Sequence, residues 1–288
     1  MPLPVTLRCA EQVCELKPEL GGCISGLWLG DVPVLRSTNA ADLQSVLQSA
    51  SFPLVPFSNR VGHAMLQWQG TAHPLVKNFA PEPHAIHGLG WERSWAVREA
   101  RDTFALLSYA HRADATWPFD FDSTQTFKVT DQALEMTISI TNRSLAAAPV
   151  GLGWHPYFTK REDTRITFSA EGRWDMGDDK LPTRHRRHPG LDVDCHSLAV
   201  DHCFDGWHGA LHLQDSVLRT RVSSHLSRLV VYTDPGLGCI AIEPVSHVNN
   251  AINLMANTGA SAESLGVRIL QPGEALSCDM RIDVERTA

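Results

Sequence analysis

Apolar and polar residues alternate with a period of two along much of this chain. From Leu134 to Thr141 the alternation is unbroken, which is typical of a strand with one buried face. Turn residues rich in Gly, Pro and Asp separate further short runs of this kind. These runs cover residues 26–29, 104–109, 124–129, 165–168, 229–233, 239–242 and 275–284.

Helical periodicity is nearly absent. Residues 40–50 are compatible with one short helix, and residues 257–265 with a loop or at most a single turn. Many strands, few helices and frequent turns predict an all-β fold, a large antiparallel β-sandwich with few short helices. No linker, low-complexity segment or internal repeat interrupts the pattern, so we expect a single domain over residues 1–288.

Charge and cysteine usage narrow the possible partners. The net charge of −7 disfavours a nucleic-acid partner, and no apolar run has the length of a membrane helix. The seven cysteines show no C-x-x-C spacing, and the N-terminus does not resemble a signal peptide. We therefore expect a cytoplasmic protein with reduced thiols. The basic cluster at residues 184–188, between two prolines, is interpreted as a solvated loop.

Two segments combine prolines, glycines and aromatic residues with potential ligand-binding groups. In the first, residues 53–60, prolines and Phe57 lead to Asn59 and Arg60, which suit either a polyhydroxylated ligand or the fixing of a loop. In the second, residues 84–91, a histidine beside glycines and Trp91 suits a sugar, although a single tryptophan more often belongs to the core. No third metal ligand lies near the two histidines of this segment, so no metal site is predicted.

Two later segments carry groups that can transfer protons. His155 lies between Trp154 and Pro156 in a glycine-rich run, and an imidazole can gain or lose a proton near neutral pH. Glu243 follows a strongly apolar strand, where burial would raise its pKa toward the range of a general base. A structural salt bridge from Glu243 to Arg60 is the alternative.

Taken in order, these segments resemble the aldose 1-epimerase (galactose mutarotase) family. The resemblance spans residues 53 to 253 and implies a galactose mutarotase-like supersandwich with a sugar in an open cleft. It rests on Asn59-Arg60, His87-Gly88 with Trp91, Gly153-x-His155-Pro156-Tyr157-Phe158, Asp201-His202-x-Phe204, and Glu243-Pro244 followed by Asn253.

The resemblance implies an isomerase that interconverts the α and β anomers of a free aldose, without a metal or other cofactor. It implies that His155 is the general acid and Glu243 the general base. The oligomeric state is left open between a monomer and a homodimer. An asparagine, Asn249 or Asn250, stands where the family has an acidic residue, which leaves the preferred aldose open. The resemblance implies that Arg60, His87 and Asp201 bind sugar hydroxyls. The chemistry of the two early segments adds Asn59 and Trp91 as candidate substrate-binding residues.

Three other functions are compatible with these residues. A hexose-6-phosphate mutarotase would need a cationic pocket, for which only residues 184–188 offer a cluster. A non-catalytic sugar-binding protein could use the same fold. A glycoside hydrolase could use Asp201 and Glu243 as its two carboxylates, but it would leave His155 without a role.

Overall fold

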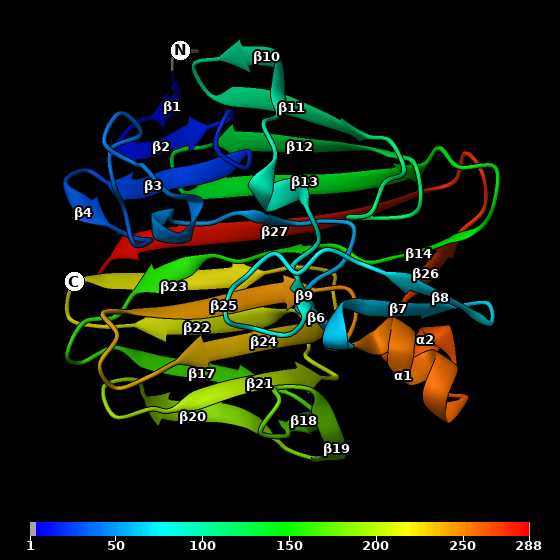
Figure 1. The fold of residues 1–288 in the computed structure, drawn as a ribbon. Coiled ribbons are helices and arrows are strands. Elements are labelled where there is room, and N and C mark those ends of the chain that lie inside the picture. Colours follow the sequence, from blue (N-terminus) through cyan, green and yellow to red (C-terminus); the bar gives the residue numbers. More distant parts are fainter. Residues whose placement is uncertain (1–3, 288) are drawn as a thin grey trace.

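The computed structural model describes residues 4–287, and antiparallel β-sheet dominates it (Figure 1). The largest sheet has nine strands, and the chain enters and leaves it several times. In spatial order these strands are β10 (Ala96–Arg101), β11 (Phe104–His111), β12 (Phe121–Val129), β13 (Ala133–Asn142), β27 (Ala275–Arg286), β23 (Leu218–Ser223), β22 (Ala210–Gln214), β17 (Arg165–Ser169) and β20 (Gly190–Asp194).

A second sheet of eight strands carries much of the candidate site. One of its strands, β16 (Tyr157–Thr159), pairs with β25 outside the main order. The other strands, in order, are β19 (Pro182–Arg187), β18 (Gly172–Met176), β21 (Val200–Asp205), β24 (Arg228–Thr233), β25 (Cys239–Val245), β15 (Gly153–Trp154) and β5 (Pro53–Leu54).

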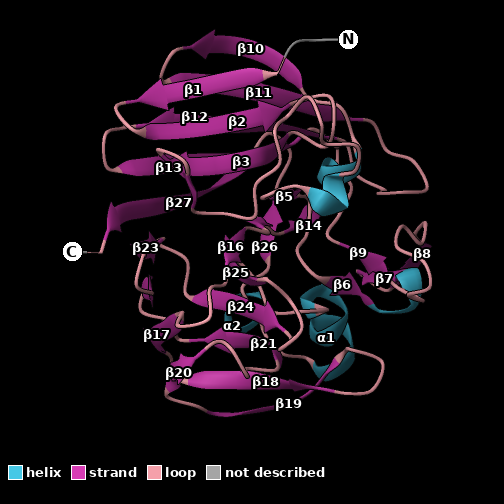
Figure 2. Cartoon of the chain, turned by 90° about the vertical axis from the view of Figure 1, so that its left-hand side faces the viewer, coloured by secondary structure: helices cyan, strands magenta, loops and turns pink. Residues whose placement is uncertain are grey.

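Smaller elements complete the fold. A four-stranded sheet contains β1 (Val5–Cys9), β2 (Gln12–Lys17), β3 (Cys23–Leu29) and β4 (Val32–Pro33), and β1 and β2 pack against β12 (Figure 2). Three two-stranded sheets pair β14 (Ala148–Val150) with β26 (Arg268–Leu270), β6 (Arg60–Val61) with β9 (Ala85–Ile86), and β7 (Met65–Trp68) with β8 (Thr71–Pro74). The helical elements are α1 (Ala251–Thr258), α2 (Ala262–Leu265) and the 3₁₀ turns η1 (Val46–Gln48), η2 (Gly62–Ala64) and η3 (Gly90–Glu92).

Burial alternates along the long strands as the period-two pattern predicts. In β13, Ile138 and Ile140 are fully buried, whereas Thr137 and Ser139 between them are only partly covered. The apolar faces of the sheets share one hydrophobic core, which burial of apolar area stabilises. The predicted all-β sandwich is confirmed, and each strand expected from the alternation is present. The single-domain organisation stays a prediction.

Strand register places two carboxylates on the same sheet face. Asp201 on β21 lies opposite Tyr232 on β24, and Glu243 on β25 lies opposite Val230 on β24. Side chains of directly paired residues project to the same face, and so do residues two apart on one strand. Val230 and Tyr232 are two apart, so the carboxylates of Asp201 and Glu243 project to a common face.

Two local predictions were wrong, and one helix was missed. Residues 40–50 form no helix beyond the short turn η1. The single turn allowed for residues 257–265 is present as α2, but the sequence analysis did not predict α1, which begins at Ala251. Asn250 and Gly259, both in the left-handed conformation, flank α1, and its eight residues are too few for a clear periodic signal. The basic cluster at 184–188 lies largely on β19 rather than in a loop. Because β19 is an edge strand exposed on both faces, it shows no alternation, and its charges discourage pairing with another chain.

Candidate active site

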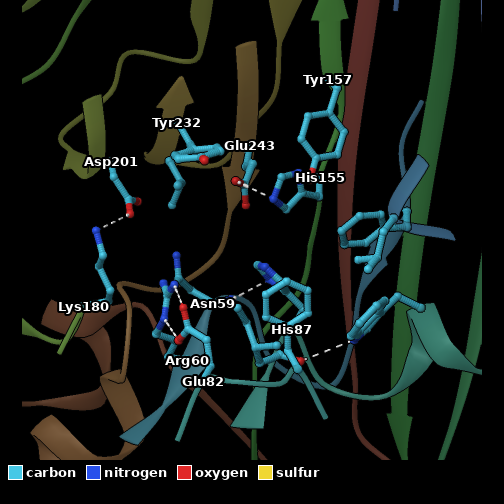
Figure 3. A pocket seen from close by; sticks show the side chains of 16 residues that line it. Asn59, Arg60, Glu82, His87, His155, Tyr157, Lys180, Asp201, Tyr232 and Glu243 are labelled. Carbon is cyan, nitrogen blue, oxygen red and sulfur yellow. Dashed lines mark hydrogen bonds and ion pairs between the residues drawn. The ribbon is translucent and has the colours of Figure 1, made fainter. Parts of the chain in front are cut away.

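All the site residues expected from the sequence line one cavity of about 340 Å³ (Figure 3). This volume falls within the range of small-molecule sites. The expected residues are Asn59, Arg60, His87, Trp91, His155, Asp201 and Glu243. The cavity is also lined by residues that the sequence analysis did not single out, and these are Leu47, Phe52, Phe79, Glu82, Ile86, Tyr157, Lys180, Val230 and Tyr232.

His155 and Glu243 meet at the wall formed by the eight-stranded sheet. Nε2 of His155 lies 3.2 Å from Oε1 of Glu243, and both side chains are almost completely buried (Figure 3). The backbone N–H of His155 donates to the carbonyl of Phe52, and its ring packs between Phe52 and Tyr157 at centroid distances of 4.8 and 4.5 Å. These contacts restrict the imidazole to the orientation that faces Glu243.

Burial disfavours the charged form of both partners. It raises the pKa of Glu243 well above its usual value, and the nearby carboxylate of Asp201 adds to this rise. Burial also lowers the pKa of His155 to about 3, and the positive charge of Arg36 adds to this effect. Both shifts favour the arrangement in which a proton shared by the pair lies on Glu243 and the imidazole of His155 is neutral. Nδ1 of His155 and Oε2 of Glu243 are buried and have no hydrogen-bond partner in the part of the chain that the structure describes.

The backbone of residues 58–63 is held by side chains from two distant segments. His247, Asn249 and Asn250 accept hydrogen bonds from the N–H groups of residues 58, 60 and 62, at 3.1, 3.1 and 2.9 Å. His87 and His84 accept from the N–H groups of residues 59 and 63, at 3.1 and 2.9 Å. These bonds hold the strand-and-turn segment that presents Asn59 and Arg60, and they give Asn249 and Asn250 structural partners.

Arg60 is paired with Glu82 rather than with Glu243. Nε and one terminal nitrogen of the guanidinium donate to the two carboxylate oxygens of Glu82, each at 2.8 Å. This fork lowers the pKa of Glu82, and it raises the pKa of Arg60 although burial acts against that charge. The remaining terminal nitrogen donates to Oδ1 of Asn59 at 3.0 Å. The salt bridge from Glu243 to Arg60, offered as an alternative, is absent among the ion pairs of residues 4–287.

His87 is neutral, and its tautomer is fixed by its backbone contact. Because Nδ1 accepts the N–H of Asn59, the ring proton resides on Nε2. Burial lowers the pKa of His87 well below its usual value, and repulsion from His155 adds to this shift. The two imidazoles pack edge to face with centroids 5.1 Å apart. His87 therefore adds a hydrogen-bond donor beside the proton-transfer pair.

The other members of the 84–91 segment have structural contacts. Both ring nitrogens of His84 are used, one by the N–H of His63 and the other by the carbonyl of Asp179. The indole N–H of Trp91 donates to the carbonyls of Ile86 and Gly88, at 3.3 and 3.2 Å, and the residue is 4% exposed. Trp91 thus lines the cavity as part of the core. No group of three or more metal-ligating side chains occurs within residues 4–287.

Asp201 and Tyr232 extend the wall that carries Glu243, because their strands β21 and β24 belong to the same sheet, and Lys180 faces Asp201. Oδ2 of Asp201 lies 3.8 Å from Nζ of Lys180, and Lys180 projects from the hairpin between β18 and β19 (Figure 3). Sequence reasoning missed Glu82, Lys180 and Tyr232. Among these, Glu82 had the only local signal, because prolines flank it on both sides. Tyr157 lay within the His155 motif but was not assigned to the site.

The antiparallel supersandwich and its cavity define the class of protein, the galactose mutarotase-like fold. A galactose mutarotase-like protein from Clostridium acetobutylicum superimposes on 98% of this chain and 95% of its own, with a TM-score of 0.85 and 18% identity. An aldose epimerase homologue from C. elegans superimposes over 99% of both chains, with a TM-score of 0.81 and 15% identity.

Sequence comparison gives the family. The Aldose 1-epimerase family model matches residues 11–283, so this chain belongs to the aldose 1-epimerase family. The protein YphB of Escherichia coli (strain K12), itself uncharacterized, is 27% identical over 282 residues, which are 92% of this chain and 93% of YphB. Within residues 4–287, no helix has the length and apolar character needed to cross a membrane.

Proposed function

We propose that this protein is an aldose 1-epimerase that interconverts the α and β anomers of a free aldose by opening and closing the sugar ring. The observation that carries the proposal is the contact between His155 and Glu243, whose Nε2 and Oε1 atoms lie 3.2 Å apart on the wall of the cavity. Ring opening needs a base at the C1 hydroxyl and an acid at the ring oxygen. An imidazole and a carboxylate that share one proton supply both groups.

The reaction balances with this single proton. Glu243, as carboxylate, takes the proton of the C1 hydroxyl while the bond from C1 to the ring oxygen breaks. His155, as imidazolium, gives its proton to the ring oxygen. The resulting aldehyde rotates about its C1–C2 bond and closes on the other face, with the two groups in reversed roles. Each positioned group contributes about 10²–10⁴ in rate.

The protonation state favoured by burial suits the ring-opened intermediate. Opening converts a charged pair, imidazolium and carboxylate, into a neutral imidazole and a carboxylic acid. Burial raises the pKa of Glu243 and lowers the pKa of His155, so it stabilises this uncharged product state. The cavity thereby offsets part of the free energy required to form the open-chain aldehyde.

The charges of the cavity support a neutral sugar as the substrate. Arg60 is matched by Glu82 through two hydrogen bonds, and Lys180 faces Asp201. A phosphate dianion would have to compete with these carboxylates for the cations. Neutral hydroxyl groups can instead accept from the cations and donate to the carboxylates. We therefore propose a free aldose rather than a hexose 6-phosphate.

An anomerisation assay tests the proposal. Freshly dissolved single anomers of glucose, galactose and arabinose are followed by polarimetry or NMR, with and without the protein. We expect the protein to accelerate equilibration at catalytic concentration, without net loss of sugar. Binding without acceleration would favour a non-catalytic sugar-binding protein, and either that result or the absence of any effect would contradict the proposed activity.

A further inference from the structure

The tip of the β18–β19 hairpin, residues 177–181, reaches the cavity and carries a lysine. Two backbone hydrogen bonds close the tip. The N–H of Gly177 donates to the carbonyl of Leu181 at 2.8 Å, and the N–H of Lys180 donates to the carbonyl of Gly177 at 2.9 Å. Lys180 has a φ of 62°, in the left-handed region that residues other than glycine rarely adopt. Surrounding contacts must therefore maintain this conformation.

Two buried side chains hold the tip in place. The side-chain amide of Asn249 donates to the carbonyl of Lys180 at 2.8 Å, and His84 bonds the carbonyl of Asp179 at 2.8 Å. Leu181 packs closely over Gly62, where an added Cβ would lie 2.9 Å from its Cδ1 atom. Buried polar groups are costly to leave unpaired, so these bonds resist displacement of the tip.

The same two side chains also hold the segment that carries Arg60. Oδ1 of Asn249 accepts the N–H of Arg60 at 3.1 Å, and Nδ1 of His84 accepts the N–H of His63 at 2.9 Å. Each of the two thus bridges the Arg60 segment and the hairpin tip. An aspartate at position 249 could accept from Arg60 but could not donate to the carbonyl of Lys180. The amide of Asn249 therefore fixes the separation between two walls of the cavity.

The ammonium group of Lys180 has donor capacity left over. Its Nζ lies 3.8 Å from Oδ2 of Asp201, which is longer than a direct hydrogen bond. The Lys180 side chain is 52% exposed and lines the cavity, and its Nζ donates no hydrogen bond within residues 4–287. A donor and an acceptor at this separation can both reach one hydroxyl oxygen, which accepts from the ammonium and donates to the carboxylate.

We propose that Lys180 is a substrate-positioning residue that, together with Asp201, binds one hydroxyl of the aldose remote from C1, and that Asn249 positions it. The proposal rests on the proposed aldose 1-epimerase activity and adds a specificity determinant to it. The carboxylate of Asp201 opposes an anionic group at this position, so the pair recognises a neutral hydroxyl. Hydroxyl recognition by a charged group gives strong discrimination against a sugar that lacks the hydroxyl.

The test compares the aldose turned over fastest with its analogues that each lack one hydroxyl. We expect wild type to discriminate strongly against one of the analogues. In Lys180→Met, kcat/KM for the parent aldose should fall about 10- to 100-fold, mainly through KM, while that analogue is little affected. Lys180→Arg should restore part of the discrimination. Lys128→Met is the matched control, because Lys128 is 56% exposed and paired with Glu135 on the sheet surface.

Asn249→Asp tests the positioning. It should reproduce the loss of discrimination, and the double variant Asn249→Asp with Lys180→Met should be no worse than the more impaired single variant. Equal effects of Lys180→Met and Lys128→Met on every sugar would overturn the proposal. An effect of Lys180→Met confined to a hexuronate or a hexose 6-phosphate would also overturn it and indicate an anion site.

The two proposals can fail separately. If wild type accelerates no anomerisation, equilibrium binding of the same sugars to wild type and Lys180→Met, measured by NMR titration, still tests the lysine. Weaker binding of the parent aldose to the variant, with binding of one analogue unchanged, would support Lys180 while the proposed activity fails. A wild-type protein that binds none of the sugars would overturn both.

Discussion

The backbone N–H of Ser58 donates to Nε2 of His247 at 3.1 Å, across 189 positions of the chain. The other ring nitrogen of His247 bonds the carbonyl of Val248 at 2.6 Å, so the buried imidazole is neutral and protonated on Nδ1. Burial lowers its pKa to about 4. This histidine links the segment after Glu243 to the segment before Asn59, and it does so only in its neutral form, because protonated Nε2 could not accept the Ser58 N–H.

The first prediction concerns pH and stability. An unfolded histidine has a pKa near 6.5, so between about pH 6.5 and 4 the unfolded chain binds a proton that folded His247 does not. Stability should therefore fall as the pH is lowered through this window, and His247 should contribute about 1.4 kcal/mol per pH unit. Urea unfolding between pH 7 and 5 should show a shallower dependence in His247→Gln than in wild type. Exposed His196→Gln is the control, and an equal slope in all three proteins would contradict the expectation.

The second prediction concerns proton transfer. Glu243→Gln and His155→Asn keep similar size but cannot take up and release a proton, so each should lower kcat by about 10²–10⁴. Both proteins should remain folded, because neither change leaves a large cavity. Anomerisation kinetics combined with unfolding midpoints provides the measurement. A variant with near-normal turnover would show that the substituted residue is neither the acid nor the base.

The third prediction concerns the pair of Arg60 and Glu82. Arg60→Ala should raise KM about tenfold or more and affect kcat less, because lost hydroxyl contacts weaken binding in ground and transition states alike. Glu82→Gln should also raise KM more than it lowers kcat, but by a smaller factor. It leaves the guanidinium in place and only loosens its orientation. Arg165→Ala removes an exposed arginine paired with Asp192 and Asp194, and it should leave both constants unchanged. A loss confined to kcat in Arg60→Ala would contradict the binding role.

The fourth prediction concerns the turn at Gly88. Its φ is +68°, and an added Cβ would lie 2.2 Å from the carbonyl oxygen of Val55. Gly70 has a similar φ of +77°, but no atom lies within 4 Å of the Cβ position. Gly70→Ala should therefore cost about 1 kcal/mol from backbone conformation alone. Gly88→Ala should cost at least about 2 kcal/mol more, because the backbone beside His87 must shift. Equal unfolding free energies for the two variants would refute the proposed close contact.

The fifth prediction concerns charge on the substrate. Because carboxylates accompany Arg60 and Lys180 in the cavity, kcat/KM for glucose should exceed that for glucose 6-phosphate by about tenfold or more. The ratio should shrink as ionic strength rises, since salt screens the repulsion of the dianion. Steady-state anomerisation of the two sugars at low and high salt measures this ratio. A preference for the phosphate would instead direct attention to Arg184, Arg186 and Arg187.

The sequence by itself determined the class of fold, because alternation along strands such as β13 is a local property of the chain. Side chains of successive residues point to opposite faces, so a half-buried strand can be recognised from the alternation in its own sequence. The short helix α1 and the exposed edge strand β19 lacked such a signal, so the helix was missed and the strand was mistaken for a loop. The motifs around His155 and Glu243 were also recognisable locally, and with them the family resemblance.

Only the tertiary structure decided which residues meet. The partner of Arg60 is Glu82 rather than Glu243, because strand pairing brings the segment before His84 alongside Arg60. Lys180 reached the cavity through the hairpin between β18 and β19, although its own segment resembles an ordinary polar turn. Hydrogen bonds and ion pairs depend on separations of a few ångströms in space. Residues far apart in the sequence come this close only when the sheets pack. The sequence therefore indicated His155 and Glu243 as candidate catalytic residues but could not show their contact.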